Sequence, residues 1–211
     1  MHQSRSAGCD PALSCPVGKG AVASRVIWPG DPGIYRKEEA AMVKVWRLDT
    51  GRAAEWRDIR LASLRDAPEA FDATFSEWRD RPLTDFAARL EAVPTFAAGD
   101  QIGRALAVAS WQAGLDPRDA RRGWLLSVFA RPEARGRGYA EAAIRAVLRD
   151  AAMAGMGSVG LHVLAANRAA QALYRRIGFR GTGRAGVTNS RGEPEVEMIL
   201  PLDNETISSG F

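Results

Sequence analysis

Apolar and polar positions follow regular periods from Met42 to about residue 202. Short alternating or continuous apolar runs predict strands, and apolar positions spaced by three or four residues predict helices. The predicted strands are 43–48, 95–100, 104–114, 124–130 and 158–165, and residues 179–202 are predicted to form a closing hairpin. The predicted helices are 51–68, 82–92, 138–154 and 167–178, with Pro68 ending the first and Thr84 or Asp85 capping the second.

Strands alternate with helices in the second half of the chain, which favours an α/β layered domain over a helical bundle or an all-β sandwich. Residues 1–41 are rich in Gly, Pro and Ser and have no sustained period, so we expect a disordered extension. Residues 42–203 are predicted to form one folded domain, and residues 204–211 a short flexible tail. Because the pattern starts at Met42, we also hypothesise that the natural chain begins there.

Composition narrows the classes of partner. The chain has 211 residues, of which 46% are apolar and 26% charged, as is ordinary for a globular protein. Its pI of about 9.5 comes from arginines scattered among acids, without the aromatic–basic interleaving of nucleic-acid-binding surfaces. Cys9, Cys15, His2 and His162 do not form a metal-binding pattern, and no apolar run approaches the roughly 18 residues of a membrane span. We therefore expect a cytoplasmic protein without nucleic-acid, metal or membrane partners.

The joint between the fourth predicted strand and the following helix has the sequence PEARGRGYA, residues 132–140. The first turn of a helix leaves backbone N–H groups without helical partners, and the helix dipole makes that end positive. Gly136 and Gly138 let the backbone bend and approach a bulky group, while Arg135 and Arg137 add charge. These features predict a phosphate or pyrophosphate site; the alternative is a tight turn with two solvated arginines.

Two other phosphate-binding patterns are excluded by their surroundings. A P-loop requires a lysine after its last glycine, and no lysine lies near this joint. The pattern Gly-x-Gly-x-x-Gly occurs at 155–160 and at 181–186, but each copy follows a helix and precedes a strand. Dinucleotide binding requires the opposite order, so we expect both segments to be turns.

Two motifs occur in a fixed order along the chain. The first is Arg135-x-x-Gly138-x-Ala140, after an apolar strand and a proline, and the second is NRAAQALYRRIGF, residues 167–179, after the next strand. They resemble the Q/R-x-x-G-x-G/A and N-x-x-A-x-x-L-Y-x-x-x-G-F signatures of the GCN5-related N-acetyltransferases, the GNAT superfamily. A weaker likeness to this family covers residues 42–202.

The resemblance implies an α/β fold with a mixed, mostly antiparallel sheet, whose central parallel strands splay apart and which is flanked by helices. The pantetheine arm of acetyl-CoA, the co-substrate of the family, would lie between the splayed strands. The N–H groups after the fourth strand would hold the pyrophosphate, and Asn167 would contact the arm near the thioester. The residues thereby assigned to the cofactor are Val128, Phe129, Ala130, Arg135, Gly136, Arg137, Gly138, Tyr139, Ala140 and Asn167.

The activity implied by the resemblance is direct transfer of an acetyl group from acetyl-CoA to a primary amine of a small molecule. Tyr174 occupies the position where many members have a general acid for the departing thiolate. An alkyl amine with a pKa of about 10.4 is mostly protonated at neutral pH, so a base or a water chain must remove a proton.

The sequence leaves the identity of this base open. Some family members carry an acid on the strand before the pyrophosphate loop, and residues 124–129 contain none. His162, in the middle of a predicted strand, is expected to be a half-buried packing residue. The candidate bases are carboxylates, each of which is more often solvated or structural: Glu69, Asp72, Glu77, Glu195 and Glu197.

Two alternative functions remain at this stage. One is an acyl-CoA-binding sensor without turnover, which the tyrosine at position 174 disfavours. The other is a peptide or protein N-terminal acetyltransferase, which predicts an acceptor groove open at both ends. The acceptor site is expected around the first two predicted helices, residues 69–78 and the final hairpin, in a monomer or a homodimer.

Overall fold

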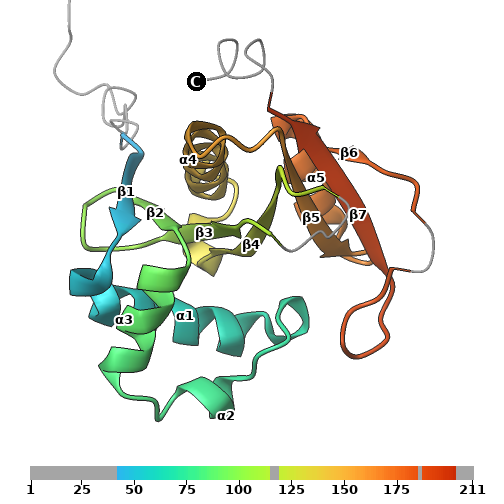
Figure 1. Ribbon diagram of the computed structural model, residues 1–211. Helices are drawn as coiled ribbons and strands as arrows, with labels where there is room; N and C mark the ends of the chain where they lie inside the picture. The colour runs from blue at the N-terminus through green and yellow to red at the C-terminus, as the bar shows by residue number, and fades with distance from the viewer. Residues whose placement is uncertain (1–41, 115–118, 185–186, 203–211) are drawn as a thin grey trace, which may run out of the picture. The chain divides into compact units, whose positions relative to one another are not determined.

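The computed structural model describes residues 42–114, 119–184 and 187–202. Figure 1 shows a central sheet with helices on both faces. The strands are β1 (Lys44–Leu48), β2 (Thr95–Gly99), β3 (Ala107–Gln112), β4 (Arg122–Ala130), β5 (Ser158–Leu164), β6 (Arg180–Gly181) and β7 (Glu195–Pro201). The helices are α1 (Ala53–Asp66), α2 (Phe75–Trp78), α3 (Leu83–Ala92), α4 (Tyr139–Met153) and α5 (Arg168–Ile177), with 3-10 turns at Thr50–Arg52, Pro68–Ala70 and Pro132–Ala134.

The sheet is mixed and mostly antiparallel. Its strand order is β1-β2-β3-β4-β5-β7-β6, and β4 and β5 form the parallel pair. All the other neighbouring strands run antiparallel. This architecture confirms the mixed sheet that the two sequence motifs imply.

The parallel pair separates soon after it begins. Residues Arg122–Trp124 of β4 pair with Ser158–Gly160 of β5, and Trp124 and Gly160 are the last partners. Both strands continue for several residues past this point, to Ala130 and Leu164. The two strands therefore form a fork that opens toward their carboxyl ends, the edge of a parallel sheet where ligands most often bind.

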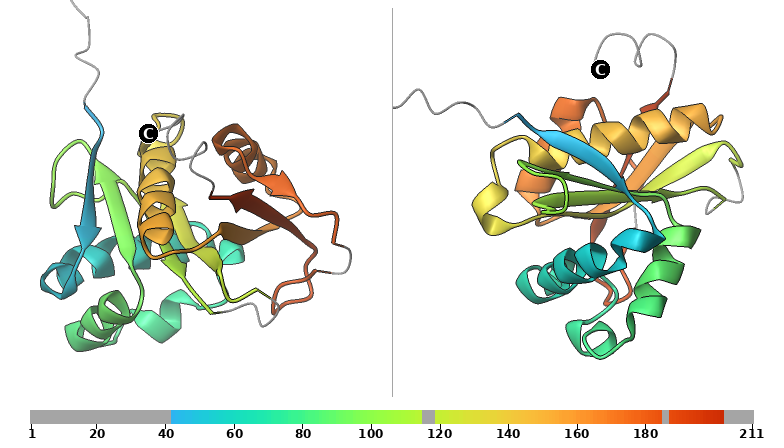
Figure 2. Two further views of the ribbon diagram at one scale, coloured as in Figure 1. Left: turned by 45° about the horizontal axis from the view of Figure 1, so that its top comes forward. Right: turned by 90° about the vertical axis from the view of Figure 1, so that its left-hand side faces the viewer.

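Helices cover the two faces of the sheet unequally. In the right-hand view of Figure 2, α4 and α5 lie on one side, and α1, α2 and α3 on the other. On the first side, Ile144 of α4 and Tyr174 of α5 share a buried core with Leu161 of β5. On the second, Ile59 of α1 and Phe129 of β4 belong to a separate buried cluster. We call these the α4 face and the α1 face.

The structure departs from the expected elements in a few places. Helix α3 begins after Pro82, whose N-cap position makes no side-chain bond, so Thr84 and Asp85 do not cap it. The loop expected at 69–78 contains the short helix α2, held by a capping box between Thr74 and Glu77. Residues 155–157 form a turn leading into β5, and the rest of the Gly-x-Gly-x-x-Gly pattern at 155–160 lies in that strand.

Several expectations concern parts of the chain outside the described residues. These are the extension 1–41, the tail 204–211, and two loop segments, 115–118 and 185–186. Within the ranges that are described, no helix has the length and apolarity needed to span a bilayer.

Candidate functional site

The open end of the fork is surrounded by the starts of two helices. Strand β4 leads through the 3-10 turn Pro132–Ala134 to α4, and β5 leads through a short turn to α5. Both helix N-termini therefore lie at the carboxyl ends of the diverging strands. Since unpaired N–H groups and the positive end of the dipole occur at the start of a helix, this edge favours an anionic ligand.

The segment before α4 has the backbone conformation that its glycines permit. Gly136 has φ 74° and Gly138, the N-cap of α4, has φ 83°, both in the left-handed region. A Cβ at either position would meet no protein atom within 4 Å, so space beside both backbones is open. Glycine is required here by conformation, and the open space can admit a ligand.

Several amides of this segment point away from the protein's own acceptors. The N–H groups of Gly136, Gly138, Tyr139 and Ala140 bond no backbone acceptor among the described residues. The amides of Arg135 and Arg137 instead close the turn, donating to Pro132 and Ala134 over 3.3 and 3.4 Å. The predicted phosphate-binding group thus reduces to four open amides and two exposed guanidinium groups, those of Arg135 and Arg137.

Two of the predicted residues of β4, Phe129 and Ala130, differ in the direction of their backbone N–H and C=O groups. The amide of Arg131 donates to Leu106, and Phe129 lies opposite Val108, so both belong to hydrogen-bonded pairs with the β3 side. Ala130, opposite Ala107, lies between them and directs its N–H and C=O into the fork, where Arg135 Nε approaches the carbonyl at 3.4 Å.

Strand β4 contains a β-bulge just before Phe129, which includes Val128. Val108 pairs with Phe129 and Ser110 with Leu126, so two β4 residues lie opposite one β3 residue, and Ser127 adopts φ 51°. The side chain of Phe129 is buried on the α1 face, and its backbone faces β3. Phe129 therefore directs no polar group into the fork, and its contact with the cofactor stays a prediction.

Asn167 and Tyr174, the predicted residues of the second motif, belong to α5. Asn167 is the N-cap: its Oδ1 accepts from the Ala170 amide at 3.0 Å, which leaves the side-chain NH₂ free to donate elsewhere. Tyr174 is 7% exposed, and its ring contacts Phe179 edge-on, with centroids 5.9 Å apart. Burial raises the pKa of the Tyr174 hydroxyl well above its usual value, so it stays protonated.

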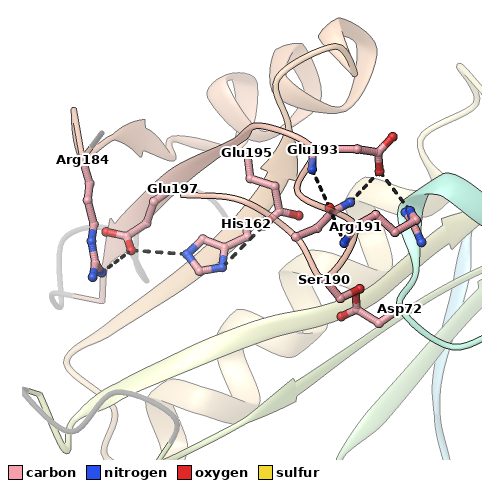
Figure 3. Close-up of polar contacts among 9 residues, drawn as sticks. Asp72, His162, Arg184, Ser190, Arg191, Glu193, Glu195 and Glu197 are labelled. Carbon is pink, nitrogen blue, oxygen red and sulfur yellow. Dashed lines mark hydrogen bonds and ion pairs between the residues drawn. The ribbon is translucent and has the colours of Figure 1, made fainter. Parts of the chain in front are cut away.

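On the α1 face, a polar cluster lies beside the apex of the fork (Figure 3). His162 of β5 is 37% exposed and lies between two carboxylates, with Nε2 3.3 Å from Glu197 Oε2 and Nδ1 3.9 Å from Glu195 Oε2. Its ring is 4.8 Å from the ring of Trp124, the last β4 residue paired with β5. The sequence-based interpretation of His162 as a half-buried packing residue is therefore incomplete: its ring packs on Trp124 and also carries this polar network.

The two carboxylates beside His162 differ in basicity. Burial raises the pKa of Glu195, and the nearby Asp72 carboxylate raises it further, against an opposing effect of His162. Burial also acts to raise the pKa of Glu197, but hydrogen bonds from His162 and Arg184 outweigh it and lower that pKa. Glu197 is thus held as an anion, which orients the imidazole, while Glu195 binds protons more readily than an ordinary carboxylate.

The segment after α1 and the hairpin before β7 are bonded to each other. Ser190 donates to Asp72 (Figure 3). Arg191 donates to the main-chain carbonyls of Glu69 and Phe71. These contacts join segments about 120 positions apart. They form what we call the acceptor bridge, made of residues 69–72 and 190–191, which stands beside the His162 cluster.

Three of the candidate bases make contacts away from His162, two of them in the acceptor bridge. Asp72 is engaged by Ser190, and Glu69 contributes its carbonyl rather than its carboxylate. Glu77 accepts from the Thr74 amide in the capping box, and hydrogen bonds from Thr74 lower the pKa of its exposed carboxyl. Of the five candidates, Glu195 and Glu197 are the two that lie beside the imidazole of His162.

Two cavities lie away from this arrangement. One of about 570 Å³ is lined mainly by β1 and α4, including Trp46, Phe96 and Met153. Another of about 320 Å³ is lined by Asp58 of α1 and Arg131 after β4, among others. Neither contains His162 or Tyr174, so the fork is identified by strand geometry and chemistry. The described residues contain no cluster of metal-ligating side chains.

Comparison with protein families agrees with this arrangement. The sequence model of the Acetyltransferase (GNAT) family matches residues 53–179, more than half of the chain. The chain belongs to the GNAT acetyltransferase family. The match includes both sequence motifs, the fork and α5, so the resemblance of the motifs is confirmed. None of the curated proteins compared with this GNAT protein matches it.

Solved structures share the GNAT fold. A GNAT-family acetyltransferase from Streptococcus pneumoniae is 16% identical with a TM-score of 0.62, covering 76% of this chain and 99% of its own. The structure of yncA from Salmonella typhimurium, a putative acetyltransferase with its cofactor acetyl-CoA, is 20% identical with a TM-score of 0.61 and coverages of 77% and 95%. A ribosomal-protein-alanine N-acetyltransferase from Brucella melitensis is 18% identical with a TM-score of 0.61 and coverages of 75% and 99%.

Proposed function

We propose that this GNAT protein transfers an acetyl group from acetyl-CoA to the primary amine of a small molecule. The observation that carries the proposal is the fork between β4 and β5, whose open end presents four unpaired amides at the start of α4. A diphosphate at those amides would place the pantetheine arm between the strands. The arm would bond the N–H of Ala130 and extend toward the apex beside Trp124 and His162.

His162 is our candidate for the base. The Glu197 carboxylate can only accept, which assigns the proton to Nε2 and leaves Nδ1 as the proton acceptor toward Glu195. A proton taken from the acceptor ammonium would convert His162 to imidazolium, and both neighbouring carboxylates stabilise that charge. Loss of this proton frees the nitrogen lone pair for attack on the thioester carbonyl carbon.

Tyr174 is our candidate for the group that assists departure of the thiolate. It lies on α5 on the α4 face, whereas His162 lies on the α1 face, so base and acid stand on opposite faces of the fork. As the carbon–sulfur bond breaks, the sulfur receives the hydroxyl proton, and the second proton of the attacking nitrogen passes to the tyrosinate through solvent, giving an amide, free CoA and neutral Tyr174. Because the pKa of Tyr174 is raised, the hydroxyl acts mainly as a hydrogen-bond donor, and its contribution is moderate.

The acceptor bridge supports a small acceptor over a peptide chain. Ser190 and Arg191 bond to the segment after α1 and join the two segments beside the His162 cluster. A peptide acceptor predicts a groove open at both ends, and a bridge of these bonded segments would narrow one end of it. A small amine fits such a site without displacing these bonds.

The proposal is tested by following the release of CoA thiol from acetyl-CoA with a panel of small amines, amino acids and short peptides. We expect release well above background hydrolysis for at least one small amine. Replacing Tyr174 by Phe should lower kcat about tenfold while the Kd for CoA stays unchanged. Acetyl-CoA binding without thiol release for any acceptor would instead support a sensor, and release with peptides alone would support an N-terminal acetyltransferase.

A further inference from the structure

Arg60 of α1 is a buried cation without a counter-ion among the described residues. The residue is 8% exposed, and its Nη1 has no hydrogen-bond partner in the described part of the chain. Its guanidinium carbon lies 5.0 Å from the ring centroid of Phe71 and 5.4 Å from that of Trp78. Burial, reinforced by Arg89, lowers the pKa of Arg60 to about 10, so the group remains charged at neutral pH.

An arrangement of this kind is costly without a ligand. Aromatic faces attract a cation, but they do not accept its in-plane N–H groups as carboxylate oxygens do. A buried charge that lacks a hydrogen-bonded partner destabilises a fold. Such a residue is therefore a strong indication of an anion that binds there.

Other unpartnered buried donors lie on the same face of the sheet. Trp56, one helical turn before Arg60 on α1, has no acceptor for its Nε1 among the described residues, and neither has Trp124 at the apex of the fork. The α1 face thus has an excess of buried donors on the side where the acceptor is expected. A ligand that fits it must bring acceptor atoms.

A series of contacts connects Arg60 to the His162 cluster. The ring of Phe71 contacts the guanidinium of Arg60, and the carbonyl of Phe71 accepts from Arg191 at 3.0 Å. Arg191 belongs to the hairpin that continues into β7, where Glu195 faces His162. Residues of the acceptor bridge and its hairpin therefore connect Arg60 with the candidate base.

We propose that Arg60 binds a carboxylate of the acceptor, so that the acceptor is an amine that also carries a carboxyl group, as free amino acids do. The planar guanidinium and the planar carboxylate match each other in shape and charge. This inference rests on the proposed acetyl transfer, and it specifies which amines enter the site. The amine would face His162 while the carboxylate satisfies the N–H groups of Arg60.

The experiment compares amino acids with their decarboxylated counterparts. The pairs are leucine with 3-methylbutylamine, phenylalanine with 2-phenylethylamine, methionine with 3-(methylthio)propylamine, and glutamate with 4-aminobutyrate, which retains one carboxylate. For the acceptors that react, we expect kcat/KM to favour the carboxylate-bearing member by about 10- to 100-fold, the strength of a charged hydrogen-bonded contact. In the Arg60→Met variant this preference should disappear, mainly through a higher KM.

Two controls separate binding from folding. Replacing an unpaired buried cation by an apolar side chain is often neutral or stabilising, so Arg60→Met should melt no lower than the native protein. Arg65→Met makes the same change on α1 at a side chain that is 64% exposed and pairs with Asp66, and we expect it to keep the preference. A higher Tm with a lost preference is the combination that a purely structural role of Arg60 would not produce.

Calorimetry of the same acceptors with the protein–CoA complex distinguishes the two proposals. Amino acids that bind through Arg60 without thiol release would support the carboxylate site and overturn the acetyl transfer. Equal turnover of amines with and without a carboxylate, or a preference that survives in Arg60→Met, would overturn the carboxylate site and leave the transferase intact. Absence of both turnover and binding for every acceptor would overturn both.

Discussion

The two sides of the fork are built from different materials. On the side where we propose that CoA binds, which we call the cofactor side, the groups available to a ligand are mainly backbone amides. Gly136 and Gly138 place these amides at the start of α4. On the acceptor side, they are side chains from distant segments: Arg60 of α1, His162 of β5 and Glu195 of β7. Backbone groups suit a ligand common to a whole family, whereas side chains can change without altering the fold.

The difference also concerns charge. The cofactor side combines exposed arginines with the positive end of a helix, so it attracts an anion while remaining solvated. The acceptor side holds its charges partly buried, with Glu197 5% exposed and Arg60 8% exposed. Because buried charges interact more strongly, we expect this side to discriminate more sharply between ligands.

The largest effect should come from the acceptor side, by replacing His162 with Ala. We expect kcat to fall about 100- to 1,000-fold, because the acceptor ammonium then loses its base. Calorimetry should show an unchanged Kd for CoA, and added imidazole should restore part of the rate. A loss of CoA affinity, or a rate that imidazole does not change, would contradict the division between the two sides.

The cofactor side is tested by a pair of glycines with the same backbone conformation. Gly138 and Gly155 lie at opposite ends of α4, with φ 83° and 82°, and a Cβ at either would meet no protein atom within 4 Å. Gly138→Ala and Gly155→Ala should therefore cost similar stability, about 1 kcal/mol each. Only Gly138→Ala should weaken CoA binding, by about 10- to 100-fold in Kd. Equal Kd values for the two variants would remove the diphosphate from this helix end.

The smallest effect is a difference between two carboxylates of β7. Glu197 has a lowered pKa, so its carboxylate stabilises the fold above the ordinary value near 4.5, and this stabilisation is lost as the pH falls through the lowered pKa. Glu195 has a raised pKa, so ionising it costs stability as the pH rises from that value through its folded pKa. At pH 7, Glu197→Gln should lower Tm by about 3–6 °C, and Glu195→Gln should leave it unchanged or raise it slightly. Thermal melts that move in the same direction for both variants would refute the assignment.

The local structure on the proposed cofactor side could be predicted from the sequence because its motifs are contiguous. Residues 132–140 and 167–179 each combine glycine or capping positions with one helix start, so local chemistry determines their role. The sequence did not show that Phe129 turns its backbone groups toward β3, because the β3 pairing and the bulge at Ser127 decide which backbone groups face the fork. Pairing of this kind depends on a different strand and is not visible in β4 alone.

The acceptor side could not be predicted to the same extent. His162 is a lone histidine in an apolar strand, and only the register of β5 with β7 places Glu197 opposite it. Arg60 lies among charged residues of α1, and its burial depends on where Phe71 and Trp78 pack after the helix ends. A signal for His162 was nevertheless present, since Glu195 and Glu197 alternate on one strand and thus share one face.

Because β4 pairs with β5 over a short length only, the sheet has an open gap between these two strands past Trp124 and Gly160. Three residue pairs join its two halves there, and past them the edges of both strands are separated. An extended ligand arm that bonds these edges would complete the sheet from within, as an inserted strand does. Binding of the cofactor would then stabilise the fold itself. The cofactor concentration in the cell would therefore also affect the stability of the contact between the two halves of the sheet.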